Sequence, residues 1–205
     1  MNLAACVGLP RTPENRVWYR ATRIGYLPSA LSSSHTAVTR SRFNAGPLLL
    51  PAARFESLYF ASDHTTALFE FGAMVGAPIP GGSVSNPAMS VVVLNVTVVL
   101  RDVADLTDIA AQTSLATNAQ ELTGDWNGYQ LRTGYTPVKN PIGVAPTQEL
   151  GDALFRAGVE GFRSISARIP YNRILIVFPT NLRLGSSVVF ADGTGTVDRI
   201  NGTRA

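Results

Sequence analysis

Met89–Leu100 is the longest apolar stretch of the chain, and Asn95 and Thr97 interrupt its run of valine and leucine. A membrane-spanning helix needs about 20 apolar residues, so this stretch is too short to cross a bilayer. Valine favours strands because its branched side chain packs well on a pleated surface. A nearly continuous apolar run is typical of a strand that is covered on both faces. The stretch therefore predicts a strand at the centre of a sheet, buried on both faces.

The rest of the chain mixes strands and helices without a regular alternation. Further strands are expected at Val17–Arg23, Ser57–Ala61, Gly161–Arg168, Arg173–Phe178 and, as a last edge strand before the turn Asp192-Gly193, Ser186–Ala191. Helices are expected at Thr65–Val75, Asp105–Leu122 and Thr147–Ala157. Loops are expected at Pro28–Pro51, Gly76–Pro87 and Asp125–Pro146. Because regular β-α-β units are missing, the pattern predicts an α+β fold with a mixed β-sheet core and flanking helices.

Composition limits the kind of protein. A chain of 205 residues with 45% hydrophobic and 15% charged residues predicts one folded domain over residues 1–205. The net charge of +3 suits an anionic ligand, but no basic run interleaved with aromatics points to nucleic acid. Cys6 is the only cysteine, and His35 and His64 have no ligand-type neighbours, so neither a disulfide nor a metal site is expected. Met1–Gly8 lacks the features of a signal peptide, so we expect a cytoplasmic protein without a membrane anchor.

The common catalytic motifs are missing, and a small polar set remains. The chain has neither a glycine loop that cradles phosphates nor a GxSxG nucleophile motif. The polar residues that stand in apolar or loop contexts are Arg42, Tyr59, Glu70 and Ser166. Glu70 falls within the stripe of Ala67, Phe71 and Met74 that the expected helix turns toward the core. A carboxylate in that position must be paired, hydrogen-bonded or pointed into a cavity.

These residues lie in settings that resemble the RES-domain toxins of bacterial RES–Xre toxin–antitoxin pairs. The segments that carry the resemblance are Ser41-Arg42-Phe43-Asn44, Leu58-Tyr59-Phe60-Ala61-Ser62, Thr66-Ala67-Leu68-Phe69-Glu70 and Gly161-Phe162-Arg163-Ser164-Ile165-Ser166-Ala167-Arg168. Further similar context is given by Asp125-Trp126 and Thr147-Gln148-Glu149-Leu150-Gly151. The resemblance runs from about residue 17 to 179. The chain departs from the family at Ser41, which replaces a glycine, and in an insertion over Leu48–Phe55. The family serine is Ser166 or Ser164, and Ser166 is preferred because it stands two residues before Arg168.

The resemblance implies a fold like that of ADP-ribosyltransferases, and it implies NAD⁺ as the substrate instead of a bound cofactor. Members of the family break the nicotinamide–ribose bond with water or inorganic phosphate as the acceptor. On this analogy Glu70 stabilises positive charge on the ribose, and Arg42 binds the pyrophosphate. Tyr59 stacks on or hydrogen-bonds the nicotinamide–ribose unit, Ser166 hydrogen-bonds a ribose or phosphate oxygen, and Trp126 lines the pocket.

Other interpretations of the same residues stay open. Glu70 could instead form a structural ion pair with Arg20 or Arg23, Arg42 could be a solvated loop residue, and Tyr59 or Trp126 could belong to the core. The activity could be ADP-ribosylation of a protein, or the chain could be a non-catalytic interaction module. The resemblance also implies an Xre-type antitoxin as a partner and a possible homodimer within that complex.

Overall fold

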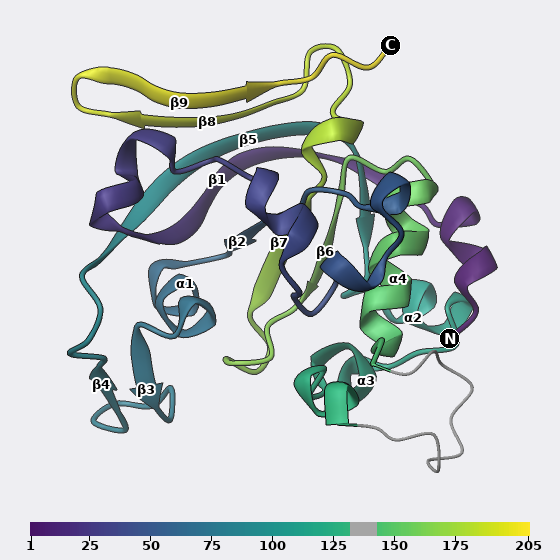
Figure 1. The fold of residues 1–205 in the computed structure, drawn as a ribbon, viewed down its shortest axis with the longest axis horizontal. Coiled ribbons are helices and arrows are strands. Elements are labelled where there is room, and N and C mark those ends of the chain that lie inside the picture. Colours follow the sequence, from purple (N-terminus) through teal and green to yellow (C-terminus); the bar gives the residue numbers. More distant parts are fainter. Residues whose placement is uncertain (132–142) are drawn as a thin grey trace.

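The computed structural model describes residues 1–131 and 143–205 and has a seven-stranded mixed sheet at its centre (Figure 1). The strands of this sheet are β1 Arg11–Arg23, β2 Leu58–Ala61, β5 Val91–Asp105, β6 Gly161–Ile165, β7 Arg173–Val177, β8 Ser187–Asp192 and β9 Gly195–Asn201. Their order is β1-β2-β7-β6-β5-β8-β9, and β1 also pairs with β5, so the first five strands of this order close into a ring. Among the strands of the described residues, only β5 and β6 pair in parallel. The predicted α+β fold with a mixed sheet is confirmed.

Helices and short turns cover this sheet. The helices are α1 His64–Phe71, α2 Ile109–Ser114, α3 Ala119–Thr123 and α4 Pro146–Arg156. The 3-10 turns are Leu3–Gly8, Ile24–Ser29, Ser34–Val38, Gly46–Leu48, Pro51–Ala53, Asn127–Leu131 and Pro179–Asn181. A small separate hairpin is formed by β3 Met74–Gly76 and β4 Ser83–Ser85. Within the described residues, none of the helices is long and apolar enough to cross a membrane.

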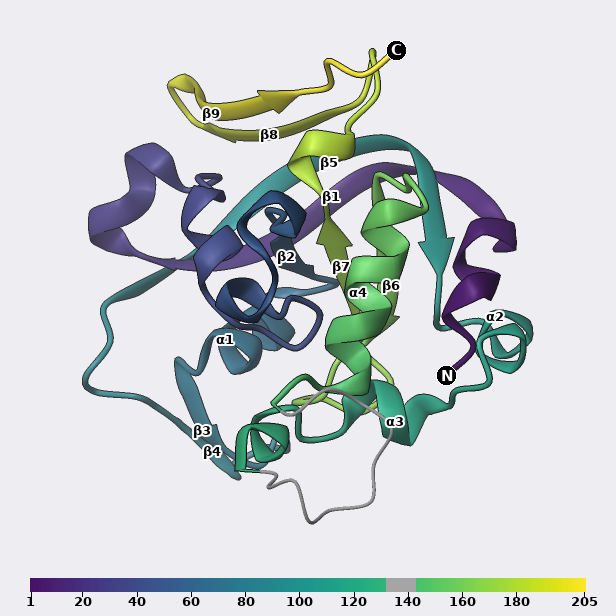
Figure 2. The same ribbon diagram turned by 45° about the vertical axis from the view of Figure 1, so that its right-hand side comes forward.

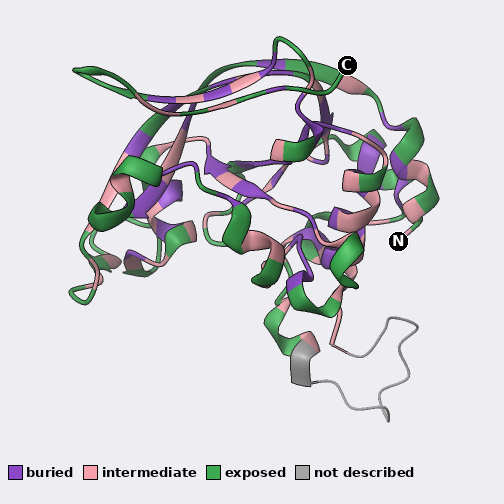
Figure 3. Ribbon diagram, turned by 45° about the horizontal axis from the view of Figure 1, so that its top comes forward, coloured by how far each residue is buried: buried purple, intermediate pink, exposed green. Residues whose placement is uncertain are grey.

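Two apolar clusters lie on the two sides of the sheet. One lies between α4 and the sheet, where Leu150 and Leu154 pack with Phe162 and Ile176. The other lies on the opposite side, and includes Trp18 of β1 and side chains of β5, β7 and β8. Figure 2 shows α4 lying across β6 and β7, and in Figure 3 buried residues alternate with more exposed ones along the strands.

The strand β5 is central, as predicted, but it is not buried on both faces. It pairs with β1 on one edge and with β8 and β6 on the other. Its even-numbered residues from Leu94 to Leu100 are buried, whereas Asn95 and Thr97 are exposed. The helix α1 packs beside the start of the strand, and further along the second face is exposed at the two polar residues. The polar interruptions in the sequence mark this open face.

The expected helix Thr65–Val75 ends earlier than predicted. The Asp63 side chain accepts a hydrogen bond of 2.8 Å from the Thr66 amide and caps the start of α1. Gly72 takes a left-handed φ of 80°, a conformation that favours glycine, and ends the helix after Phe71. The predicted stripe of Ala67, Phe71 and Met74 is therefore wrong, because Met74 belongs to β3 and Phe71 is 36% exposed.

Two further predictions are corrected. The expected helix Asp105–Leu122 is two short helices, α2 and α3, because Ala116 has a φ of 49° that interrupts it and Asp108 and Asn118 each cap a new start. The last strand of the sheet is β9 and not β8, since the turn after β8 folds the chain back into a hairpin. The helix predicted at Thr147–Ala157 is confirmed as α4. The expected loop Asp125–Pro146 lies partly outside the described residues.

Candidate active site

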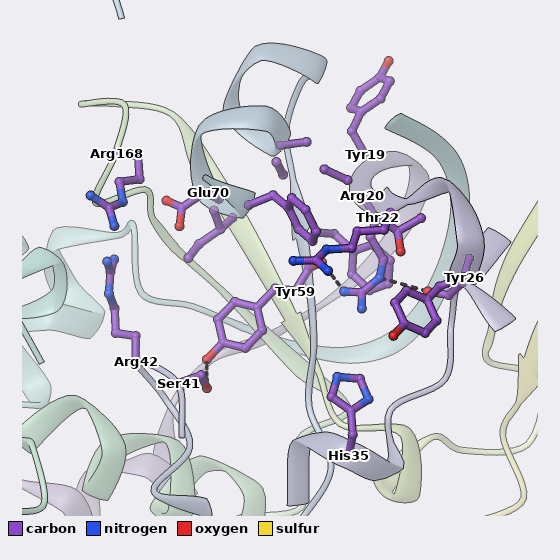
Figure 4. Close-up of a pocket in the computed structure, with 18 of the residues that line it drawn as sticks. Tyr19, Arg20, Thr22, Tyr26, His35, Ser41, Arg42, Tyr59, Glu70 and Arg168 are labelled. Carbon is purple, nitrogen blue, oxygen red and sulfur yellow. Dashed lines mark hydrogen bonds between the residues drawn. The ribbon is translucent and has the colours of Figure 1, made fainter. Parts of the chain in front are cut away.

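A cavity of about 850 Å³ opens between β1, β2, α1 and the loops that follow β1 (Figure 4). Its size falls in the range of about 300–1,000 Å³ that is usual for small-molecule sites. The expected site residues Arg42, Tyr59, Glu70 and Trp126 all contribute to its wall. Ser166 lies directly behind Glu70, which it contacts. The structure therefore brings together residues that are more than 100 positions apart in the sequence.

Glu70 is held in place by the loop between β6 and β7. One of its carboxylate oxygens, Oε1, accepts hydrogen bonds from the Ser166 hydroxyl at 2.5 Å and from the Ala167 amide at 3.1 Å. Neither Arg20 nor Arg23 forms an ion pair with it in the described part of the chain. The side chain is half-buried at the cavity wall, so its carboxylate is available to a ligand.

Ser166 supports Glu70 from a buried position. Its Oγ donates to Glu70 and accepts hydrogen bonds from the amides of Arg168 at 3.1 Å and Ile169 at 3.0 Å. The side chain is 2% exposed, and it is not part of the cavity wall. Ser164 is also buried and its hydroxyl has no partner among the described residues. Of the two serines, Ser166 is the one that contacts Glu70, and its contact with a substrate oxygen stays a prediction.

Replacing Ser166 with alanine is expected to lower both stability and activity. The change leaves two amides and the Glu70 carboxylate each short of one hydrogen bond, which costs about 1–3 kcal/mol of unfolding free energy. The carboxylate keeps its bond from Ala167, so we expect a loss of activity of roughly tenfold instead of a complete loss. Chemical denaturation and initial rates measure the two effects. Unchanged activity would show that Ser166 does not position Glu70.

Arg42 stands in a tight turn and points into the cavity. Its Nε and Nη1 atoms are buried without a hydrogen-bond partner among the described residues. Burial lowers the pKa of Arg42, and the Glu70 carboxylate partly opposes that shift. Figure 4 shows its guanidinium directed toward that of Arg168, beside Glu70. Two facing cations, of which Arg42 has donors without a partner among the described residues, form a site that suits an anion.

Tyr59 presents its ring to the cavity and its hydroxyl to the turn that carries Arg42. The hydroxyl lies 2.8 Å from the Ser41 Oγ and accepts a hydrogen bond of 3.0 Å from the Phe43 amide. Burial raises the pKa of Tyr59 to about 12, so the phenol is neutral at physiological pH. The side chain therefore connects β2 with the Arg42 turn.

The site also contains Arg20, for which the sequence suggested only an ion pair with Glu70. Its Nε donates to the Ala30 carbonyl and its Nη1 to the Tyr59 carbonyl, both at 3.0 Å. Burial lowers the pKa of Arg20 to about 10, and no described carboxylate pairs with it. One signal in the sequence could have indicated Arg20. It stands two residues after Trp18, and residues two apart in a strand point to the same face, so its charge lies on the face that carries the buried tryptophan.

The cavity wall is strongly cationic. Within residues 1–131 and 143–205, the arginines that line it are Arg20, Arg23, Arg40, Arg42 and Arg168, while Glu70 is the carboxylate. The Arg40 guanidinium lies 5.9 Å from the centre of the Trp126 ring, which forms part of the rim. In the described ranges no group of three or more histidine, cysteine or acidic side chains could hold a metal ion. The charge balance favours a ligand with several negative charges.

The fold and the site define an α+β protein with an arginine-lined cavity that contains the Glu70 carboxylate. A sequence profile of the RES domain matches residues 17–198, and the chain belongs to the RES domain family. The match extends beyond the predicted limit at residue 179 and includes β8 and part of β9. No curated protein sequence matches the chain.

A solved structure has a similar fold. It is a chain of the M. tuberculosis MbcT–MbcA toxin–antitoxin complex, with a TM-score of 0.59 and 18% sequence identity. The match covers 86% of this chain and 81% of that one. The likeness supports the arrangement of the sheet and helices described above.

Proposed function

We propose that this chain is a toxin that depletes NAD⁺ by breaking its nicotinamide–ribose bond. The observation that carries the proposal is the Glu70 carboxylate at the wall of a cavity where two nitrogens of Arg42 have no partner among the described residues. Membership of the RES domain family supports it, and so does a similar fold in a complex described as toxin–antitoxin. A dinucleotide offers what this wall would bind: a pyrophosphate for the arginines and a ribose for the carboxylate.

The proposed reaction needs few groups. As the glycosidic bond stretches, its electron pair passes to the nicotinamide nitrogen, and nicotinamide leaves as a neutral base. The ribose then carries oxocarbenium character, which a carboxylate on the cavity wall stabilises. An oxygen of water or inorganic phosphate forms the new bond to the ribose carbon. With water the products are nicotinamide, ADP-ribose and a proton.

Each residue of the wall has a proposed role in this reaction. Glu70 faces the ribose, and Ser166 orients Glu70 through the hydrogen bond between them. Arg42 and Arg168 bind one part of the pyrophosphate, and Arg20 adds charge deeper in the cavity. Tyr59 offers its ring to the nicotinamide–ribose unit, and Trp126 closes the rim.

Nicotinamide release is the measurement that tests the proposal. Purified protein, free of any antitoxin, is mixed with NAD⁺ with and without inorganic phosphate, and the products are separated by chromatography. We expect nicotinamide in stoichiometric amounts with ADP-ribose or, if phosphate is the acceptor, its phosphorylated form. Folded protein that releases no nicotinamide under either condition would refute the proposal and favour a non-catalytic interaction module.

The same experiment addresses the alternative acceptor. If the chain is an ADP-ribosyltransferase that modifies a protein, labelled ADP-ribose appears on protein in a lysate and free ADP-ribose stays low. The cavity walls described above suit either acceptor, because both reactions break the same bond.

We also propose an antitoxin of the Xre type as partner, with action in the cytoplasm where NAD⁺ is found and with homodimers within the complex. Co-expression with a neighbouring reading frame tests the partner.

A further inference from the structure

The turn that carries Arg42 is held by hydrogen bonds of its backbone and by the packing of Phe43, whereas the Arg42 side chain is not held in this way by the described residues. Within it, the Ser41 amide donates to the Asn44 carbonyl at 2.8 Å and the Asn44 amide donates to the Ser41 carbonyl at 3.3 Å. The Phe43 side chain is fully buried and packs edge-on against the Phe162 ring at 5.0 Å. The Arg42 guanidinium extends from this fixed base without a partner for its Nε and Nη1 among described residues.

Gln148 of α4 connects this turn to the rest of the protein. Its side chain is fully buried, and its Nε2 donates to the Ser41 carbonyl at 2.8 Å and to the Asn44 carbonyl at 3.4 Å. Its Oε1 accepts from the Ala145 amide at 3.0 Å and from the Arg40 guanidinium at 3.3 Å. One carboxamide thus joins both ends of the turn to the start of α4.

Gly151, three residues further along α4, lets the helix approach the turn. A Cβ atom at this position would lie 1.8 Å from the Phe43 carbonyl oxygen, a distance that no side chain tolerates. Residues three apart share one face of a helix, so Gln148 and Gly151 meet the turn together. The face of α4 that they form is shaped around the backbone of residues 41–44.

A purely structural role would also explain a buried glutamine, but the location of its contacts argues for more. In the described part of the chain no residue of α4 lines the cavity, and yet α4 holds the turn that does. The hydrogen bonds of Gln148 lead to the segment that directs the desolvated Arg42 cation into the cavity. A turn whose backbone is held in this way loses little freedom when Arg42 binds a ligand, which strengthens binding.

We propose that Gln148 is a positioning residue that fixes how far Arg42 reaches into the cavity, with Gly151 providing the room. The inference rests on the proposed function, in which Arg42 binds the phosphates of the dinucleotide. Gln148 does not touch the substrate. Its removal should weaken phosphate binding through Arg42 and leave bond breaking at Glu70 largely intact.

A double-mutant cycle tests this. The variants are Gln148→Met, Arg42→Met and the double variant, and methionine keeps the volume of both side chains. Gln112→Met is the matched control, because Gln112 is also buried, but its side chain donates to the Leu106 carbonyl at 2.8 Å and not to the turn that carries Arg42. The readouts are the Kd for ADP-ribose by calorimetry and the KM and kcat for NAD⁺.

We expect Gln148→Met to raise Kd and KM about tenfold with kcat within about twofold, and Arg42→Met to raise them roughly a hundredfold. The double variant should match Arg42→Met, because Gln148 acts only through Arg42. The control Gln112→Met should bind ADP-ribose with the Kd of the wild type. Effects that multiply to about a thousandfold, or a change confined to kcat, would overturn the inference, as would wild type that fails to bind ADP-ribose.

The two proposals fail in different ways. The effects of Gln148→Met and Arg42→Met on ADP-ribose binding can be coupled in a protein that releases no nicotinamide. That result supports the role of Gln148 and overturns only the proposed cleavage. Nicotinamide release with independent effects of Gln148 and Arg42 overturns only the role of Gln148.

Discussion

Glu70→Gln is expected to lower kcat for nicotinamide release by about 100- to 1,000-fold while the fold stays intact. The substitution removes the negative charge that would stabilise the ribose cation, and it changes little else. The amide oxygen of glutamine can still accept the hydrogen bonds that Ser166 and Ala167 give to Oε1. The effect should therefore appear in kcat, with KM changed far less, because a transition-state interaction is lost and substrate binding is kept.

The measurement compares initial rates of the wild type and the variant at saturating NAD⁺, together with their unfolding transitions. Glu56→Gln is a matched control, since Glu56 is also partly buried and hydrogen-bonded, to Ser33, but lies outside the cavity wall. We expect the control to keep its activity. If Glu70→Gln retained more than about a tenth of the wild-type rate, a charged carboxylate would not be required and another group would have to stabilise the ribose.

The elements that could be predicted from the sequence are those with local causes. The strand β7 has an apolar run closed by Pro179, and α4 has a clear apolar face that ends before Gly158. The site residues Glu70 and Arg42 could be found because family-like motifs surround them, and the structure brings them to one cavity. Local chemistry and motif order were sufficient for these features.

The features that could not be predicted depend on contacts distant in sequence or on single backbone angles. The break at Ala116 is a positive φ in a residue that normally favours helix, and no local pattern indicates it. Arg20 becomes a site residue only because the ring of strands turns β1 toward β2 and the cavity. The contact of Gln148 with Ser41 joins residues 107 positions apart. Such arrangements follow from packing, which the sequence specifies only as a whole.

Arg42→Met is expected to change binding and stability in opposite directions. The variant loses the paired charged hydrogen bonds to phosphate, so KM for NAD⁺ should rise roughly a hundredfold, and a lysine would restore only part of the loss because it lacks the planar fork. In the absence of ligand, however, the guanidinium contributes little to the fold. Its Nε and Nη1 are buried without partners among described residues, and it faces Arg168.

The pKa of Arg42 gives the direction of the stability change. Burial lowers this pKa more than Glu70 raises it, so the folded protein disfavours the charged form that arginine adopts at neutral pH. Methionine fills a similar volume without this cost, and the free energy of unfolding should rise by about 0.5–2 kcal/mol. Arg54→Met is the contrasting control, because Arg54 donates to the Leu49 and Pro47 carbonyls outside the cavity, and its loss should not stabilise. A less stable Arg42→Met would mean that Glu70 compensates the buried charge before any ligand binds. A more stable variant that binds NAD⁺ poorly would show that the buried charge of Arg42 lowers the stability of the fold and is kept because the ligand needs it.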